Sequence, residues 1–314
     1  METHPTPSAR AREIVAGAYD THVHVAPDVV PRVIDDLTLA YRFLAVGMKG
    51  FVLKSHYVQT GERAAVVRRA VPGVDALGAL CLNVPVGGLN PVAVEIAARS
   101  GARIVWFPTM DSVNQRATVG EIPAGAKPPM WLALMEELKA EGIDPDPVLV
   151  VDDRGDLLPA AHDVLTLIAK HDLTLATGHL SASEIMTLVP AAAAAGVRRI
   201  IVTHPEFPSQ RLAVEQQLEL AAHGALMERC YTTPATGKIP WDEMIEHIVA
   251  VGAEHSILSS DLGQPTNPPV EDGLALMADD LIARGISEDD VHTMAVTNSV
   301  RLMTPSTAPV GAVR

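Results

Sequence analysis

Short apolar runs recur along the chain, and each ends in polar or ionisable residues. Eight such runs can be distinguished, at residues 18–24, 50–53, 77–82, 103–107, 173–176, 199–202, 225–227 and 256–258. Runs of this length and apolar content are typical of buried strands. Successive runs end about 25 to 30 residues apart, which is the length that a strand, a helix and their loops require. Only the interval from Pro108 to His179 is much longer.

Helical patterns fill the intervals between the runs. The clearest cover residues 34–46, 62–71, 91–100, 183–195, 212–223 and 241–251, and two more, 270–284 and 288–303, follow the last run. Ser181 and Glu184 have the spacing of a capping box at a helix start. Strands that alternate with helices in this way predict an α/β fold, and specifically a closed (β/α)8 TIM barrel. A doubly wound open sheet is the alternative, but no glycine-rich phosphate loop follows the first run.

The long interval predicts an elaborated fourth β/α unit. Residues 130–140 and 160–170 have helical patterns, and segments 148–151 and 156–158 flank a turn, which suggests a small β-hairpin. Residues 109–129 are rich in Gly, Pro and polar side chains and are expected to form a loop over the barrel mouth, either as a lid or as a plain solvent loop. The predicted organisation is an N-terminal extension (1–17), a single barrel domain (18–304) and a flexible tail (305–314).

The amino-acid composition indicates what the core is made of and which binding partners the net charge disfavours. Hydrophobic residues make up 48% of the 314 residues and aromatic residues 4%, so the predicted core consists mainly of Ala, Val, Leu and Ile. The formal net charge of −14 argues against nucleic acid or an anionic membrane as a partner. Cys81 and Cys230 lie in apolar runs and are expected to be buried thiols. We expect a soluble, cytoplasmic protein that acts on a small molecule, and a homo-oligomer stays compatible with the sequence.

Four histidines and one aspartate fall at the predicted strand ends. A barrel of this kind has its site at the C-terminal ends of the strands. His22 and His24 point the same way from one strand and can bind one metal together. His179 and His204 follow neighbouring strands, and Asp261 follows the eighth strand, which adjoins the first in a closed barrel. Placement of all five by chance is improbable, so the sequence predicts a metal site, in which Asp261 can ligate the metal and also hydrogen-bond the metal-bound water.

Other residues near the strand ends have open roles. Lys54 is expected either to bridge two metals as a carbamate, after reaction with carbon dioxide, or to bind substrate as an ammonium group. His56 is a candidate ligand, substrate contact or packing residue. Further candidate substrate contacts at the strand ends are Tyr57, Arg229, Tyr231 and Lys238.

At these residues the chain resembles the amidohydrolase superfamily. Members carry His-x-His after strand one, histidines after strands five and six, and an aspartate after strand eight, and His22, His24, His179, His204 and Asp261 match this order and spacing. Segment 296–303 also resembles the terminal helix of that superfamily. The resemblance implies hydrolysis of an amide, cyclic amide or imide, lactone or ester by metal-activated hydroxide, with Asp261 transferring the proton.

One departure from the superfamily pattern bears on the metal count. Two-metal members usually take a bridging lysine or glutamate from strand four, but here that run leads into Trp106 and Phe107, and the lysine follows strand two. One or two divalent ions are therefore expected, with zinc first and Mn, Fe or Ni as alternatives. A metal-dependent decarboxylase on the same barrel and a phosphoester hydrolase are the competing functions.

Overall fold

Eight parallel strands form one sheet in which each strand pairs with the next along the chain. The computed structural model describes residues 4–119 and 130–305. The strands are β1 (Tyr19–Val23), β2 (Gly50–Leu53), β3 (Asp75–Cys81), β4 (Ala102–Trp106), β5 (Thr174–Ala176), β6 (Ile200–Val202), β7 (Ala225–Cys230) and β8 (Ser256–Ser259). Backbone hydrogen bonds from His24 N to Leu262 O (2.8 Å) and from Asp261 N to His22 O (2.9 Å) join β1 to the end of β8. The predicted (β/α)8 TIM barrel is therefore confirmed.

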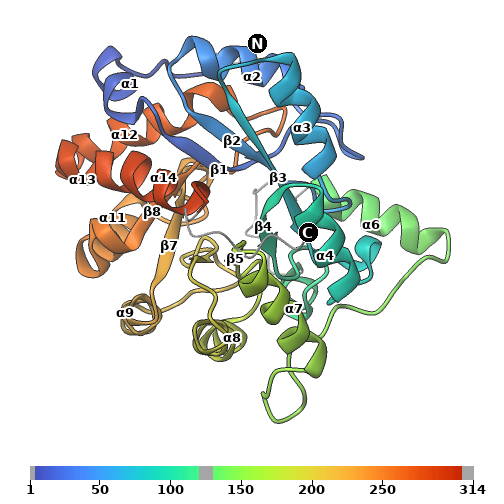
Figure 1. Ribbon diagram of the computed structural model, residues 1–314. Coiled ribbons are helices and arrows are strands. Elements are labelled where there is room, and N and C mark those ends of the chain that lie inside the picture. The colour runs from blue at the N-terminus through green and yellow to red at the C-terminus, as the bar shows by residue number, and fades with distance from the viewer. Residues whose placement is uncertain (1–3, 120–129, 306–314) are drawn as a thin grey trace.

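Helices surround the strands, as Figure 1 shows. The covering helices are α2 (Asp36–Ala45), α3 (Gly61–Ala70), α4 (Pro91–Arg99), α7 (Pro159–Lys170), α8 (Ala182–Ala194), α9 (Val214–Ala222), α11 (Trp241–Val251) and α12 (Gly273–Ala283). The Ser181–Glu184 capping box begins α8 as predicted. Short 3₁₀ turns occupy Val84–Val86, Ala253–His255 and Val270–Asp272. None of the helices in residues 4–119 and 130–305 is long and apolar enough to span a membrane.

The C-terminal segment closes the lower end of the barrel. The helix expected at 288–303 is divided into α13 (Glu288–His292), a π-helical turn (Thr293–Thr297) and α14 (Asn298–Met303). Leu302 and Met303 are buried against the barrel interior together with Leu226 and Ile257. The Arg103 side chain donates a hydrogen bond to the carbonyl oxygen of Met303 (3.4 Å) from the start of β4. This end is therefore packed with side chains, and the opposite end carries the ends of the strands.

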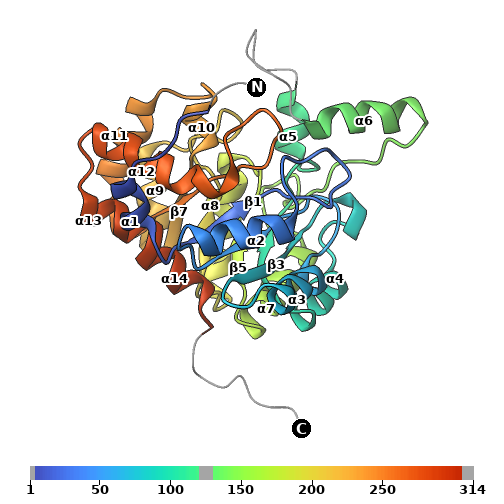
Figure 2. The same cartoon turned by 90° about the horizontal axis from the view of Figure 1, so that it is seen from above.

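The fourth unit differs in part from its prediction. The short helix α5 (Val113–Thr118) lies within the segment expected to be a loop, and the rest of that segment, 120–129, falls outside the described residues. Helix α6 (Met130–Ala140) follows, with the predicted bounds. The expected hairpin is reduced to one antiparallel bridge between Val151 and Leu157. In Figure 2, α5, α6 and α10 (Thr232–Ala235) lie toward one end of the barrel.

The N-terminal extension contains a helix that the pattern did not predict. Helix α1 (Ala9–Val15) packs beside α12, and the Ser8 hydroxyl donates to Asp279 Oδ1 (2.6 Å). Ser8 also caps α1 by accepting a hydrogen bond from Ala11 N. The first described residues are thus anchored to the last covering helices, and the domain bounds 1–17, 18–304 and 305–314 stay predictions.

Candidate metal centre

Five imidazole rings form a closed circuit at the C-terminal mouth of the barrel. The ring centroids of His22 and His24 are 5.4 Å apart, those of His24 and His56 5.0 Å, and those of His56 and His179 6.2 Å. His179 is 5.1 Å from His204, and His204 is 6.2 Å from His22, which completes the circuit. All five histidines are at most 8% exposed. Residues from four separate strand ends therefore converge on one point.

Asp261 joins this circuit from the eighth strand end. Its Oδ1 atom lies 3.2 Å from His22 Nε2 and 3.2 Å from His24 Nε2. These three side chains form a group whose ligand atoms all lie within 4.8 Å of one another. The Thr232 hydroxyl donates to Asp261 Oδ2 (3.1 Å) and fixes the carboxylate plane. One imidazole pair and one carboxylate are a donor set that suits divalent transition metals.

The backbone is strained at two of these positions. His204 has φ 26° and Asp261 has φ 53°, in the left-handed region that non-glycine residues rarely adopt. Such a conformation costs about 1 to 3 kcal/mol and tends to occur at functional sites. Gly178, directly before His179, also has a left-handed backbone (φ 66°), which glycine adopts without strain. Any larger residue would be excluded there, because its Cβ would collide with the carbonyl oxygen of Phe107.

Lys54 lies inside the circuit of histidines. Its Nζ atom is 2.8 Å from His22 Nε2 and 5.2 Å from the centroid of the Trp106 ring. Trp106 ends β4, is fully buried and packs 5.6 Å from the His22 ring, so it forms the floor of the mouth. Lys54 is thus the lysine among the described residues that reaches the histidines. Its role as a carbamate or an ammonium group stays a prediction.

Burial keeps most of these imidazoles neutral. Desolvation lowers the pKa of His24, His56 and His179 well below the ordinary value and that of His204 to about 4. Neutral imidazoles are the form that binds metal. Among the described residues, the buried Nδ1 atoms of His24, His179 and His204 have no hydrogen-bond partner. Unpartnered buried nitrogens of this kind fit a centre that receives a cation.

His22 and Asp261 behave as a coupled pair. Burial and the Lys54 ammonium group lower the pKa of His22, but Asp261 and Glu228 outweigh both and raise it to about 9. Burial raises the pKa of Asp261, yet His22 and His24 hold it well below the usual range. Without a metal, His22 therefore carries a proton between two carboxylates. A metal ion would replace that proton as the counter-charge.

Glu228 belongs to the centre and was missed by sequence reasoning. It is fully buried, and its Oε1 and Oε2 atoms lie 3.2 and 3.3 Å from His22 Nδ1. Cys230 is close to the same nitrogen, with 3.9 Å between its Sγ atom and His22 Nδ1. Strand alternation from Leu226, which faces the barrel interior, also turns Glu228 inward. That alternation is the signal that could have identified it.

Arg229, an expected substrate contact, is on the opposite face of β7. It is fully buried against the covering helices, and its guanidinium donates to Gln217 Oε1 (2.8 Å) and contacts Glu206. The same alternation that turns Glu228 inward turns Arg229 outward. The structure thus does not bring Arg229 to the mouth, and the expectation for it is wrong in geometry. Asp20, two residues before His22 on β1, accepts backbone N–H bonds from His22 and Ser260 at its Oδ1 atom.

The other three expected contacts lie around the centre. The Tyr57 ring packs edge-on to His56 at 6.2 Å. The Lys238 Nζ atom lies 5.3 Å from the Phe207 ring centroid, and that ring is 4.8 Å from His204. Desolvation lowers the pKa of Lys238, opposed by the charge of Asp261. Their contact with a substrate remains a prediction.

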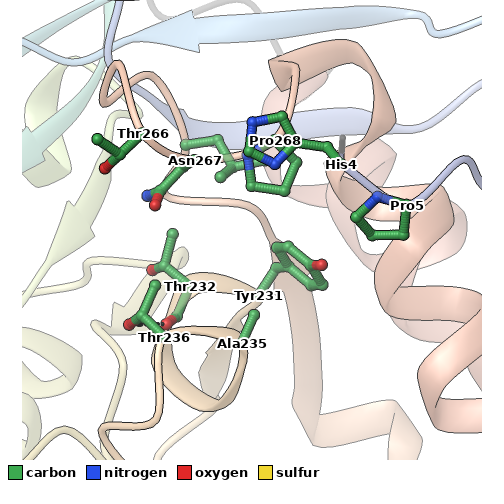
Figure 3. A pocket seen from close by; sticks show the side chains of 10 residues that line it. His4, Pro5, Tyr231, Thr232, Ala235, Thr236, Thr266, Asn267 and Pro268 are labelled. Atoms are coloured by element: carbon green, nitrogen blue, oxygen red, sulfur yellow. Dashed lines mark hydrogen bonds between the residues drawn. The ribbon is translucent and has the colours of Figure 1, made fainter. Parts of the chain in front are cut away.

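Tyr231 lines a cavity next to the centre. The cavity has a volume of about 650 Å³, and its lining comes from the N-terminal arm, the segment after β7 and the segment after β8. Figure 3 shows Thr232 and Thr236 on one side, facing Thr266 and Asn267, with His4 near Pro268. None of the lining residues carries an acidic or permanently charged side chain. Thr232 connects this cavity to Asp261 through its hydroxyl group.

Several solved structures share the (β/α)8 barrel fold of this chain. A probable dipeptidase from Pseudomonas aeruginosa is 13% identical, with a TM-score of 0.60 over 94% of this chain and 96% of its own. A putative 2-pyrone-4,6-dicarboxylic acid hydrolase from Pseudomonas putida is 16% identical (TM-score 0.56, 91% and 97% covered). A 2,6-dihydroxybenzoate decarboxylase from Rhizobium is 15% identical (TM-score 0.53, 92% and 98% covered). At 13 to 16% identity these likenesses confirm the predicted fold.

Sequence comparison gives the family itself. Residues 17–228 match DUF6282, described as a family of unknown function, and the chain belongs to it. No curated protein is significantly similar in sequence. The matched region contains His22, His24, Lys54, His179 and His204, whereas Asp261 lies beyond it.

Proposed function

We propose that the protein is a metal-dependent hydrolase of the amidohydrolase type. Its ligands would be His22, His24, His179, His204 and Asp261, with Lys54 as the candidate bridge. The observation that carries this proposal is the closed circuit of buried imidazoles around Lys54 and Asp261 at the barrel mouth. The proposed resident ion is zinc, with Mn, Fe or Ni as alternatives that the same donors suit.

A divalent ion in this centre supplies activated water at neutral pH and polarises a substrate carbonyl group. Asp261 is positioned to transfer the proton of the attacking water. Its carboxylate is held ionised by His22 and His24, and its Oδ2 is oriented by Thr232. We assign it the removal of a proton from the attacking water and delivery of that proton to the leaving group. The buried Trp106 floor excludes water from below the reacting groups.

The proposed substrates are amides, cyclic amides or imides, and lactones. The uncharged cavity beside Thr232 offers hydroxyl, amide and imidazole groups to an uncharged part of such a molecule. Lys238 has no acidic partner among the described ion pairs, so its ammonium group is available to an anionic substituent. Two solved structures with this fold carry names that describe hydrolysis of bonds of the proposed kind, a putative 2-pyrone-4,6-dicarboxylic acid hydrolase and a probable dipeptidase.

A decarboxylase is the second candidate, because β4 ends in Trp106 and provides neither a lysine nor a glutamate that could bridge two metals. Metal analysis of the purified protein separates the two functions. Two ions per chain together with a carbamate on Lys54 support the hydrolase, and one ion without a carbamate supports the decarboxylase. A screen of lactones, cyclic amides and aromatic carboxylic acids then follows. Absence of any bound divalent ion after incubation with zinc or manganese would refute both.

A further inference from the structure

Glu228 is a buried carboxylate that the proposed chemistry does not use. It projects from β7 into the barrel and is 0% exposed. Besides His22, its partner is Ser259, whose hydroxyl donates to Oε1 (2.8 Å). A carboxylate without solvent contact needs compensating partners, because desolvation of a lone charge is costly. The described surroundings provide that compensation through the His22 ring.

The geometry determines which nitrogen of His22 carries a proton. Both Glu228 oxygens face His22 Nδ1 at 3.2 and 3.3 Å. An ionised carboxylate only accepts hydrogen bonds, so Nδ1 must be the protonated nitrogen. The lone pair is then left on Nε2 when the ring is neutral. Nε2 is the atom that faces Asp261 Oδ1 (3.2 Å) and Lys54 Nζ (2.8 Å).

We propose that Glu228 is a positioning residue for the metal: through the Nδ1–H bond it locks the His22 tautomer and ring orientation and makes Nε2 a stronger ligand. This inference rests on the proposed metal centre and adds to it a residue outside the ligand set. A carboxylate behind a ligating histidine has this effect in metal proteins generally.

Cys230 does not take over the role. Its Sγ atom is 3.9 Å from His22 Nδ1 and 3.5 Å from Ser259 Oγ. Burial raises the pKa of the thiol well above its ordinary value, so it stays protonated and a weak acceptor. Glu228 is the stronger acceptor of the two.

The test measures zinc affinity in metal-free protein by calorimetry. Glu228→Gln keeps the shape of the side chain but can donate as well as accept, so it no longer enforces one tautomer. Glu228→Met removes the acceptor. The matched control is Glu206→Gln, because Glu206 is also fully buried in the ion pair with Arg229 but lies behind the sheet. We expect both Glu228 variants to bind zinc about 10- to 100-fold more weakly, and the control to bind like wild type.

A second readout is independent of affinity and of folding stability. In the zinc-loaded protein the Nδ1–H proton of His22 should give a far-downfield proton NMR signal, assigned by its loss in His22→Asn. The signal should persist in Glu206→Gln and move upfield or vanish in Glu228→Gln. Wild-type zinc affinity together with an unchanged signal in the Glu228 variants would overturn this inference alone. Failure of the wild type to bind any divalent ion would overturn it together with the proposed function.

Discussion

Two buried charged clusters lie on opposite faces of β7, and they differ in how their charged and polar groups are paired. Outside the barrel, Arg229 meets Glu206 and Gln217, and Gln217 Nε2 in turn bonds His247 Nδ1 (2.8 Å). Inside the barrel, His22 and Glu228 belong to a centre with several unpartnered ring nitrogens among the described residues. In the outer cluster Arg229 and Glu206 balance each other's charge, although neither Glu206 oxygen has a hydrogen-bond partner among the described residues. The inner cluster differs in that its unpartnered atoms are ring nitrogens, which can bind a metal ion.

The difference indicates what each cluster is for. Burying polar groups without partners is destabilising, so such groups persist where something else compensates them. The charges of the outer cluster are matched within it, and its Arg229–Gln217 hydrogen bond ties α9 to the sheet. The inner cluster is the one that we propose to hold a cation. Substitutions on the two sides of one strand should therefore separate stability from metal-dependent chemistry.

The largest effect is expected at the inner centre. Asp261→Asn should lower kcat by about 10²- to 10⁴-fold on any substrate that the screen identifies, because the proton carrier is lost. Steady-state kinetics measure this. The matched control Asp272→Asn changes a carboxylate that pairs with Arg12 away from the mouth, and should retain activity. Equal losses in the two variants would contradict the assigned role.

A substitution in the outer cluster should lower stability and leave zinc binding unchanged. Arg229→Met leaves Glu206 buried without its counter-charge, which should lower the free energy of unfolding by about 3 to 5 kcal/mol. Urea denaturation of the metal-free protein measures this. Zinc stoichiometry of the folded fraction should stay at the wild-type value. A variant with normal stability but reduced zinc content would show that the two clusters are not separate.

Metal removal should act through the inner cluster alone. Treatment with a chelator should abolish turnover, and added zinc should restore it. Zinc at a thousand times its dissociation constant should raise the free energy of unfolding by about 4 kcal/mol. The same increment is expected in Arg229→Met, measured by thermal denaturation with and without zinc. If zinc does not raise the free energy of unfolding of the wild type, the proposed metal centre is contradicted.

The smallest expected effect is a pH dependence of the metal-free protein. The pKa of His22 is raised to about 9 in the folded state, against 6.5 when unfolded, so the folded state holds an extra proton between these values. Stability is then greatest below pH 6.5 and falls as pH rises through 9, by about 1.5 kcal/mol between pH 6.5 and 8. Urea titrations at both pH values measure this slope. His22→Asn should flatten the slope, and an equally steep slope in that variant would contradict the assignment.

The strands were predictable because each apolar run is short and ends in polar residues. Parallel strands buried on both faces have no alternation of their own, so the pattern locates a strand without showing which residues face inward. That is why Arg229 was expected at the mouth and Glu228 was overlooked: both directly follow the run at residues 225–227, and the interior position of Leu226 decides between them.

Long-range packing limited the prediction elsewhere. Segment 288–303 has one helical pattern, yet it is divided by a π-helical turn where Asn298 bonds the carbonyl oxygens of Ala253 and Ser256. These hydrogen bonds join residues that are 45 and 42 positions apart, so no local pattern encodes them. The convergence of His22, His179 and Asp261 was predictable for a different reason, since barrel closure brings all strand ends to one rim.

The plug formed by Leu302 and Met303 below Trp106 makes the barrel blind-ended. Any small molecule that reacts at the centre must arrive and depart through the same opening. A product that stays bound there blocks the next substrate molecule, so tight-binding products should behave as competitive inhibitors.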